Sequence, residues 1–160
     1  MKDSPKKNAP SHNLLDRARR YCAMTEQCET GVRQKLVAWG AAPAEVDPII
    51  ASLRSDDYLN DGRYARVFAE SKILQQHWGR QKVLYQLRLK HLPKEAIAES
   101  MALIDNETYQ GILADEAEKK LRVLGGDLTP DVRYRLQAFL VSRGFTVEEI
   151  NQVINNNSAL

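Results

Sequence analysis

Basic side chains gather in the middle of this 160-residue chain, and Lys and Arg are the residue types that bind phosphate groups or acidic protein surfaces. Residues 61–92 hold seven Lys or Arg but only two Asp or Glu. The segments on either side, 21–60 and 93–128, are net negative, so the formal net charge of the whole chain is only +2. The sequence therefore predicts a local basic surface. The alternative interpretation is a solvated helical face with an accidental excess of positive charge.

Candidate contact residues are the basic side chains of this segment and two arginines that follow further along the chain. Tyr85 joins them as the aromatic residue on the polar side of its predicted helix. The candidates are Arg63, Arg66, Lys72, Arg80, Lys82, Tyr85, Arg88, Lys90, Arg133 and Arg135.

Other reactive constellations are weak in the sequence. Cys22 and Cys28 form no CxxC pair and the three His are scattered, so we expect reduced thiols and no zinc site. Asp56, Asp57 and Asp61 are candidates for Mg²⁺, but their place before a predicted helix favours capping. Because no phosphate loop or nucleophile motif is present, we expect no enzyme activity, cofactor or metal. No run approaches the roughly 18 apolar residues of a membrane span.

Helical spacing of apolar residues recurs along the chain, and strand-like alternation is hard to find. Several helix boundaries are marked by their residue types. Thr129 followed by Pro130 is typical of a helix start, and Thr146 with Glu149 forms a capping box. Gly125 next to a second glycine is a stop signal. We predict an all-α fold of about nine helices.

The predicted helices form three groups of three that align with one another. Shifts of 51 and then 53 residues align four sets of apolar positions: Val32, Val83 and Leu136; Leu36, Leu87 and Leu140; Val46, Ile97 and Ile150; Ile50, Met101 and Ile154. The same shifts place Gly40 on His91 and Gly144, and Arg80 on Arg133, so these two arginines would line one face. We therefore predict an elongated, curved array of three tandem three-helix repeats, helix-turn-helix-like in form. The alternative is the chance similarity that helix pairs show in any helical protein.

The predicted organisation has five parts. A disordered tail covers 1–12, the three repeats cover 13–59, 60–104 and 105–156, and a frayed C-terminus covers 157–160.

One stretch of the second repeat carries a family motif. Residues 58–68, Tyr-Leu-Asn-Asp-Gly-Arg-Tyr-Ala-Arg-Val-Phe, resemble the most recognisable stretch of the RecX family. The likeness continues through Gly79, Lys82 with the Val that follows it, and Lys90, and Arg-Gly-Phe at 143–145 matches the family's third-repeat ending.

The sequence departs from the family pattern at two places. The capping box that usually opens the second helix of the first repeat is lost at Cys28-Glu29-Thr30-Gly31. His91 stands where a Gly usually ends the helix in a left-handed conformation. These departures put local stability in doubt more than function.

The resemblance implies a specific role. RecX-like proteins are all-α monomers of three tandem three-helix units that lie in the groove of the RecA–DNA filament. There they inhibit ATP hydrolysis, strand exchange and coprotease activity, and some bind DNA directly. The implied partners are RecA, its nucleoprotein filament, and single- or double-stranded DNA. The implied setting is cytoplasmic control of DNA repair, homologous recombination and the SOS response. The alternatives are a helical DNA-binding protein acting without RecA, or an adaptor solenoid that binds only protein.

Overall fold

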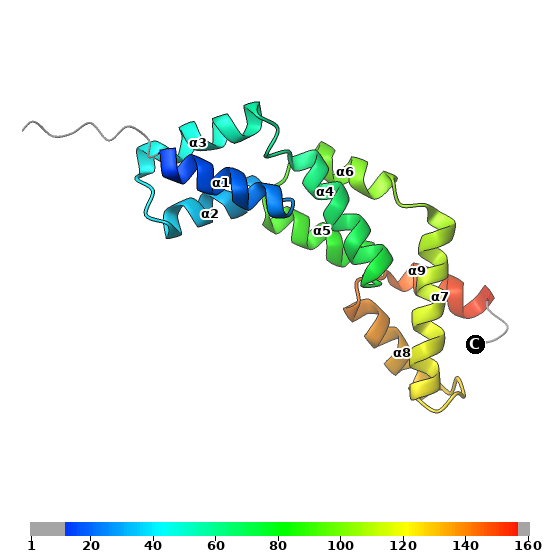
Figure 1. Cartoon of the computed structure of the whole chain (residues 1–160). Helices are drawn as coiled ribbons and strands as arrows, with labels where there is room; N and C mark the ends of the chain where they lie inside the picture. Colours follow the sequence, from blue (N-terminus) through cyan, green and yellow to red (C-terminus); the bar gives the residue numbers. More distant parts are fainter. Residues whose placement is uncertain (1–11, 157–160) are drawn as a thin grey trace, which may run out of the picture. The chain divides into compact units, whose positions relative to one another are not determined.

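The computed structural model of this chain describes residues 12–156, and over that range its regular secondary structure is entirely helical. The all-α prediction is confirmed. The predicted N-terminal tail lies outside the described residues except for His12, which begins the first helix, and the predicted fraying at 157–160 lies outside them altogether. The helices are α1 (His12–Met24), α2 (Glu29–Ala38), α3 (Pro43–Ser55), α4 (Asp61–Glu70), the π-helical segment η1 (Ser71–Gln75), α5 (Arg80–Leu89), α6 (Lys94–Ala102), α7 (Asn106–Val123), α8 (Pro130–Ser142) and α9 (Val147–Asn156) (Figure 1).

The helix starts that the sequence marks most clearly are formed as predicted. The Thr129 hydroxyl accepts a hydrogen bond from the Val132 amide at 3.3 Å and caps α8. At α9 the Glu149 amide donates to the Thr146 hydroxyl at 3.2 Å, while the Glu149 carboxylate accepts from the Thr146 amide at 2.9 Å. Both caps satisfy amides that the first helical turn leaves without partners.

Helix α7 is capped by Asp105, whose carboxylate accepts from the Thr108 amide at 2.8 Å. Hydrogen bonds donated to this carboxylate, led by that of the Thr108 amide, lower the pKa of Asp105. A carboxylate gains more from this position than a carboxamide because it also meets the positive end of the helix dipole.

Contacts divide the chain into two compact units, and the first is Met1–Tyr64, called the N-terminal unit below. Its helices α1, α2 and α3 pack against one another around a shared apolar core. Trp39 packs edge-on against Tyr21 at 5.7 Å between ring centroids, and the Arg17 guanidinium lies 4.2 Å from the Trp39 ring. The buried core residues are Ala18, Cys22, Val32, Leu36, Val46, Ile49, Ile50, Leu53 and Leu59.

The acidic cluster of the N-terminal unit forms ion pairs, which corrects the capping role inferred from sequence. Asp56 Oδ2 lies 2.8 Å from Arg19 Nη2, and Asp61 Oδ2 lies 3.1 Å from Arg54 Nη2. The N-cap of α4 is Asn60, whose side-chain oxygen accepts from a backbone amide at 2.9 Å. Asp57 Oδ2 lies 3.1 Å from Arg63 Nη1, so each of the three aspartates has a basic partner. No group of residues suited to a metal ion occurs in the described part of the chain.

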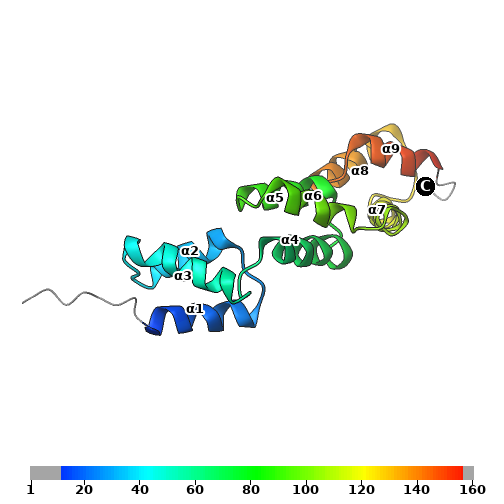
Figure 2. The same cartoon turned by 90° about the horizontal axis from the view of Figure 1, so that it is seen from above.

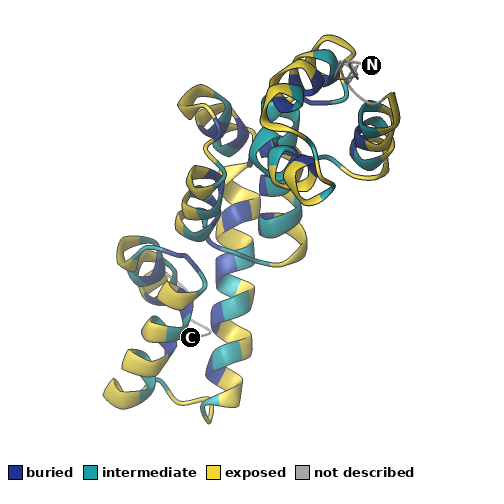
Figure 3. Ribbon diagram, turned by 90° about the vertical axis from the view of Figure 1, so that its left-hand side faces the viewer, coloured by how far each residue is buried: buried dark blue, intermediate teal, exposed yellow. Residues whose placement is uncertain are grey.

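The second compact unit, Ala65–Leu160, is called the C-terminal unit below. Within it η1 packs against both α5 and α7, and α5 packs on α6. Helices α7, α8 and α9 pack against one another (Figure 2). Buried residues recur along α7 at Tyr109, Leu113, Ala117 and Leu121, while its remaining faces are largely open (Figure 3). This spacing is the one expected of an amphipathic helix.

The positions aligned between the three repeats play the same part in each. Eleven of the twelve aligned apolar residues are buried, and Met101 is half-buried. The aligned helix ends all have positive φ: +87° at Gly40, +57° at His91 and +101° at Gly144. The three-helix organisation predicted from the sequence is thus present, whereas the exact repeat bounds stay a prediction. None of the helices between residues 12 and 156 is both long and apolar enough to cross a bilayer.

Candidate functional site

Helix α5, at the centre of the predicted basic region, is held at its first turn by the end of α8. The Gly79 amide donates to the Arg143 carbonyl at 2.8 Å, and the Gln81 amide donates to the Gly144 carbonyl at 3.0 Å. Backbone amides without an intrahelical partner at the start of α5 therefore donate to backbone carbonyls without an intrahelical partner at the end of α8. We call this contact the α5–α8 joint.

Two glycines let the backbones meet at the α5–α8 joint. A Cβ added to Gly79 would lie 2.1 Å from the Gly144 carbonyl carbon, and one added to Gly144 would lie 2.4 Å from Lys82 Cβ. Neither site has room for a side chain. The Arg143 guanidinium strengthens the joint by donating to the His77 carbonyl at 3.3 Å and to the Gln76 carbonyl.

Arg80 is also occupied at this joint. Its amide donates to the Tyr109 hydroxyl at 3.0 Å, its guanidinium lies 4.0 Å from the Tyr109 ring centroid, and Nη2 donates to the Ile104 carbonyl at 3.3 Å. The Tyr109 hydroxyl in turn donates to Glu149 at 3.3 Å, and burial raises the pKa of Tyr109 to about 12. Arg80 thus fixes the start of α5, so we regard it as a positioning residue; its predicted contact with a partner stays a prediction.

Lys72 and Lys82 converge on one indole ring. Their ammonium groups lie 4.9 and 4.2 Å from the Trp78 ring centroid, within the range of cation–π attraction. Lys72 also donates to the Gln76 carboxamide at 3.2 Å. Among the described residues neither lysine forms an ion pair, so two positive charges remain unneutralised around Trp78.

The outer face of α5 continues this surface. Tyr85 is 60% exposed and Leu89 is 54% exposed, and their four-residue spacing places them on the same side of the helix. Arg88 is exposed, and Lys90 is half-buried and engaged with a neighbour. We call Lys72, Trp78, Lys82, Tyr85 and Arg88 the α5 face.

The remaining candidates lie elsewhere. Arg63 belongs to the N-terminal unit, where it pairs with Glu26 and with Asp57 Oδ2 at 3.1 Å. Arg66 is exposed on α4. Of the two candidates on α8, Arg133 donates to the Asn155 side chain at 3.4 Å, and Arg135 is 3.1 Å from Asp131 Oδ2.

The charges of Arg63 and Arg135 are thus partly satisfied, whereas Arg66 forms no ion pair with any residue between 12 and 156. Sequence reasoning could not separate these cases, because each acidic partner except Asp131 lies far from its arginine in the sequence or on another element.

Sequence reasoning missed two basic side chains, His91 and Lys94, as candidates. Together with Arg88 they line a cavity of about 550 Å³ between α5 and α6. The signal in the sequence was their three-residue spacing from Arg88 onward across the α5–α6 turn.

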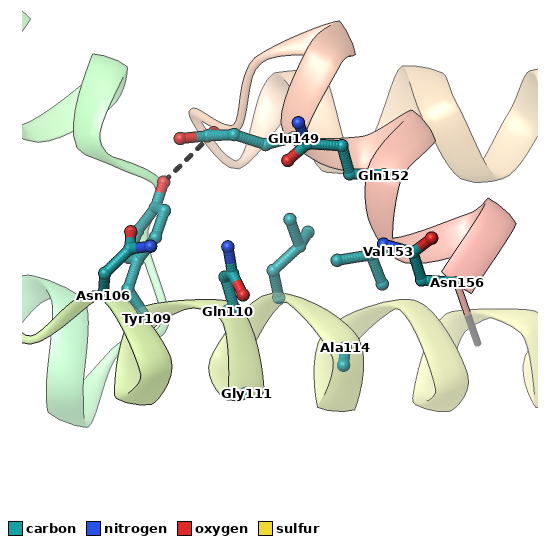
Figure 4. A pocket seen from close by; sticks show the side chains of 10 residues that line it. Asn106, Tyr109, Gln110, Gly111, Ala114, Glu149, Gln152, Val153 and Asn156 are labelled. Carbon is teal, nitrogen blue, oxygen red and sulfur yellow. Dashed lines mark hydrogen bonds between the residues drawn. The ribbon is translucent and has the colours of Figure 1, made fainter.

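A second cavity, of about 420 Å³, lies between α7 and α9 and is close to neutral (Figure 4). Its polar lining is mostly carboxamides, among them Gln110 and Gln152. Its one carboxylate, Glu149, already accepts from Tyr109 and from the Thr146 amide. This cavity therefore adds nothing to the basic surface.

Comparison with known proteins identifies the fold and the family. The model of the second three-helix domain of RecX matches residues 60–101, and that of the third matches residues 107–154. Together they cover more than half of the chain. The chain belongs to the RecX family.

Two relatives that match nearly the full length of the chain are both named as RecX proteins. "Regulatory protein RecX" of Clostridium beijerinckii is 29% identical over 157 residues, which are 95% of this chain and 73% of that protein. The protein of the same name from Cronobacter sakazakii is 27% identical over 166 residues, which are 98% of this chain and 99% of that protein. These relatives are named as regulatory proteins.

Solved RecX structures share the fold. The crystal structure of RecX from Lactobacillus salivarius aligns with a TM-score of 0.80 at 18% identity, over 90% of this chain and 94% of that one. A second crystal structure of regulatory protein RecX aligns with a TM-score of 0.81 at 19% identity, over 89% of this chain and 70% of that one.

Proposed function

We propose that this RecX-family chain binds RecA and the RecA–DNA filament in the cytoplasm and inhibits ATP hydrolysis, strand exchange and coprotease activity. In this way it would modulate DNA repair, recombination and the SOS response. Family membership is the observation that carries the proposal. The protein acts by binding, without catalysis.

The α5 face supports a binding role. It combines Lys72 of η1 with Lys82, the exposed Tyr85 and the exposed Arg88 of α5. Among the described residues, neither lysine forms an ion pair. Unneutralised charge favours association with an anionic surface, and exposed aromatic and arginine side chains are the types that dominate binding energy at interfaces. Arg66, which is exposed on α4, is a further candidate for contact with an anionic partner.

The direct test titrates the purified chain into cognate RecA assembled on single-stranded DNA and follows ATP hydrolysis. We expect inhibition at chain concentrations below or near that of RecA. Full ATP hydrolysis at equimolar chain would contradict the proposal.

A charge-reversed variant tests the proposed surface separately from the function. Arg66→Glu/Lys82→Glu should weaken inhibition about tenfold or more, because both changes put repulsive charge where an anionic partner binds. The matched control, Arg20→Glu/Arg122→Glu, makes the same change in net charge on α1 and α7 and should inhibit like the parent chain. Circular dichroism checks that each variant keeps its helices.

The competing functions predict other results. A DNA-binding protein acting without RecA would bind oligonucleotides equally well with RecA absent and leave ATP hydrolysis per filament unchanged. A protein-only adaptor would show neither effect.

A further inference from the structure

The groove between the second and third helices of a repeat is spanned by a polar side-chain pair in two of the three repeats. In the first repeat Arg33 Nη1 donates to Asp47 Oδ1 at 2.7 Å. In the third, Gln137 Nε2 donates to Asn151 Oδ1 at 3.5 Å. The shifts that align the repeats also align these pairs, so both occupy the same place in the fold.

The second repeat has two apolar residues, Leu84 and Ala98, at the aligned positions. They cannot form a hydrogen-bonded bridge, and the cavity of about 550 Å³ between α5 and α6 opens at this place. Leu92 and Ile97 are buried and line it as well, so its wall is mainly aliphatic. Apolar surface left open to water carries a free-energy cost that a binding partner would remove.

Three cationic or basic side chains, Arg88, His91 and Lys94, line the same cavity. All three are exposed, and within the described residues none of their side chains has a hydrogen bond or an ion pair. The acidic residues of α6, Glu95 and Glu99, are not among the lining residues. Positive charge is therefore available beside the aliphatic wall.

These three side chains are particular to the second repeat. The aligned residues are Val37, Gly40 and Pro43 in the first repeat and Val141, Gly144 and Val147 in the third. His91 has a φ of +57°, a conformation that suits the glycines of the other two repeats better than a residue with a Cβ. An unfavourable conformation kept beside a cavity points to a use for the side chain.

We propose that the α5–α6 cavity binds an acidic peptide segment of a partner protein. An aliphatic or aromatic side chain of the segment inserts between Leu84 and Ala98, and flanking carboxylates pair with Arg88 and Lys94. A nucleic acid fits this site less well, because its backbone offers no aliphatic anchor and no Trp, Tyr or Phe side chain lines the cavity for base stacking. The inference goes beyond the proposed function, since it does not require RecA to supply the segment.

The test uses the full chain and a short fluorescein-labelled peptide in which a central Leu-Phe pair is flanked by glutamates. We expect fluorescence anisotropy to rise on titration with the chain. A peptide with Ser-Ser in place of Leu-Phe should bind about tenfold more weakly, because it lacks the anchor.

Two variants address the wall and the charges of the cavity. Leu84→Arg/Ala98→Asp installs the polar pair that spans the groove in the first repeat, so it should keep the fold and weaken peptide binding at least about tenfold. Arg88→Glu/Lys94→Glu replaces exposed residues and should weaken binding to a similar extent. The matched control, Arg20→Glu/Arg122→Glu, reverses two exposed arginines outside the cavity and should bind like the parent chain.

The outcomes separate the site from its alternatives. Loss of binding in both cavity variants with binding kept in the control supports the site, whatever the result of the RecA assay. No anisotropy change for the parent chain, or an equal loss in the control, overturns it. A labelled oligo-dT that binds in place of the peptide and loses affinity in the same cavity variants would also overturn it, in favour of a nucleic-acid site.

Discussion

The contacts that join helices of the N-terminal unit outside its apolar core differ in kind from those of the α5–α8 joint in the C-terminal unit. In the N-terminal unit the connections are side-chain ion pairs: Glu29 contacts both Arg33 and Arg54, and Arg54 also contacts Asp61. In the C-terminal unit the α5–α8 joint is made by backbone groups, with Gly79 and Gly144 in direct contact.

The difference teaches which changes each unit tolerates. Partly exposed ion pairs adjust to substitution and weaken in salt, whereas a close backbone contact leaves no space for one added methyl group. The chain offers a natural reporter for each unit, because Trp39 lies in the first and Trp78 in the second. Urea unfolding followed by fluorescence in Trp39→Phe and Trp78→Phe backgrounds can therefore measure the two units separately.

The largest effect should come from Gly79→Ala. Gly79 has a φ of −72°, which alanine adopts without strain, so the variant tests only the missing space at the joint. We expect the C-terminal unit to lose about 1–3 kcal/mol of unfolding free energy. The control is Gly111→Ala, at a helical site where a Cβ meets nothing within 4 Å, which should raise stability by about 0.5–1 kcal/mol. Equal urea midpoints for Gly79→Ala and Gly111→Ala would contradict the proposed contribution of the α5–α8 joint to stability.

The second effect concerns the hydroxyl that joins Arg80 to Glu149. Tyr109→Phe leaves the part-buried Arg80 amide without its acceptor and should cost the C-terminal unit about 1–2 kcal/mol. Tyr85→Phe, at an exposed hydroxyl on α5, should change stability by less than about 0.5 kcal/mol. If the two variants unfold alike in urea, the hydroxyl bridge contributes nothing.

A tyrosine pKa provides a pH test shared by both units. Burial raises the pKa of Tyr64 in the N-terminal unit, and of Tyr109 in the C-terminal unit, to about 12 from 10.0. Their contribution to stability is complete below pH 10.0 and falls as the pH rises through about 12. Absorbance titration at the tyrosinate band should lose one late-titrating group in each of Tyr64→Phe and Tyr109→Phe.

A smaller effect, confined to the N-terminal unit, should follow from Glu29→Gln. Burial opposes ionisation of Glu29, but the guanidiniums of Arg54 and Arg33 outweigh it and lower its pKa. Its stabilising contribution is present above the pKa of an unfolded Glu and is lost as the pH falls through the lowered pKa. We expect the variant to lose about 1 kcal/mol of unfolding free energy at neutral pH, and less in high salt. Its unfolding free energy, followed by Trp39 fluorescence, should also decrease less steeply as the pH falls into the acid range. A salt-independent loss would argue against the ion-pair account.

The smallest effect should come from Arg135→Ala on α8. Its pair with Asp131 is exposed on both sides and four residues apart on one helix, so removing it should cost less than about 0.5 kcal/mol. If Arg135→Ala lowers the unfolding free energy of the C-terminal unit as much as Glu29→Gln lowers that of the N-terminal unit, ion pairs are equally important in both units. Urea midpoints by Trp78 fluorescence provide the measurement.

Much of the fold could be predicted from the sequence because its signals are local. Thr129, Thr146 with Glu149, and the aligned turns at Gly40, His91 and Gly144 all have the predicted structures. The candidate site was less predictable. Arg80 and Lys82 look equivalent in sequence, yet one lies on Tyr109 within the fold and the other on the half-buried Trp78.

The sequence by itself determined the nine helices of the described region, their grouping in threes and the family, since apolar periodicity and capping residues act within a few residues of one another. Only the tertiary structure decided that Gly79 meets Gly144, that Arg63 is neutralised by Glu26, and that Leu84 and Ala98 leave a cavity open. The physical reason is that these features depend on which side chains meet across the space between helices, and spacing along one chain does not specify that.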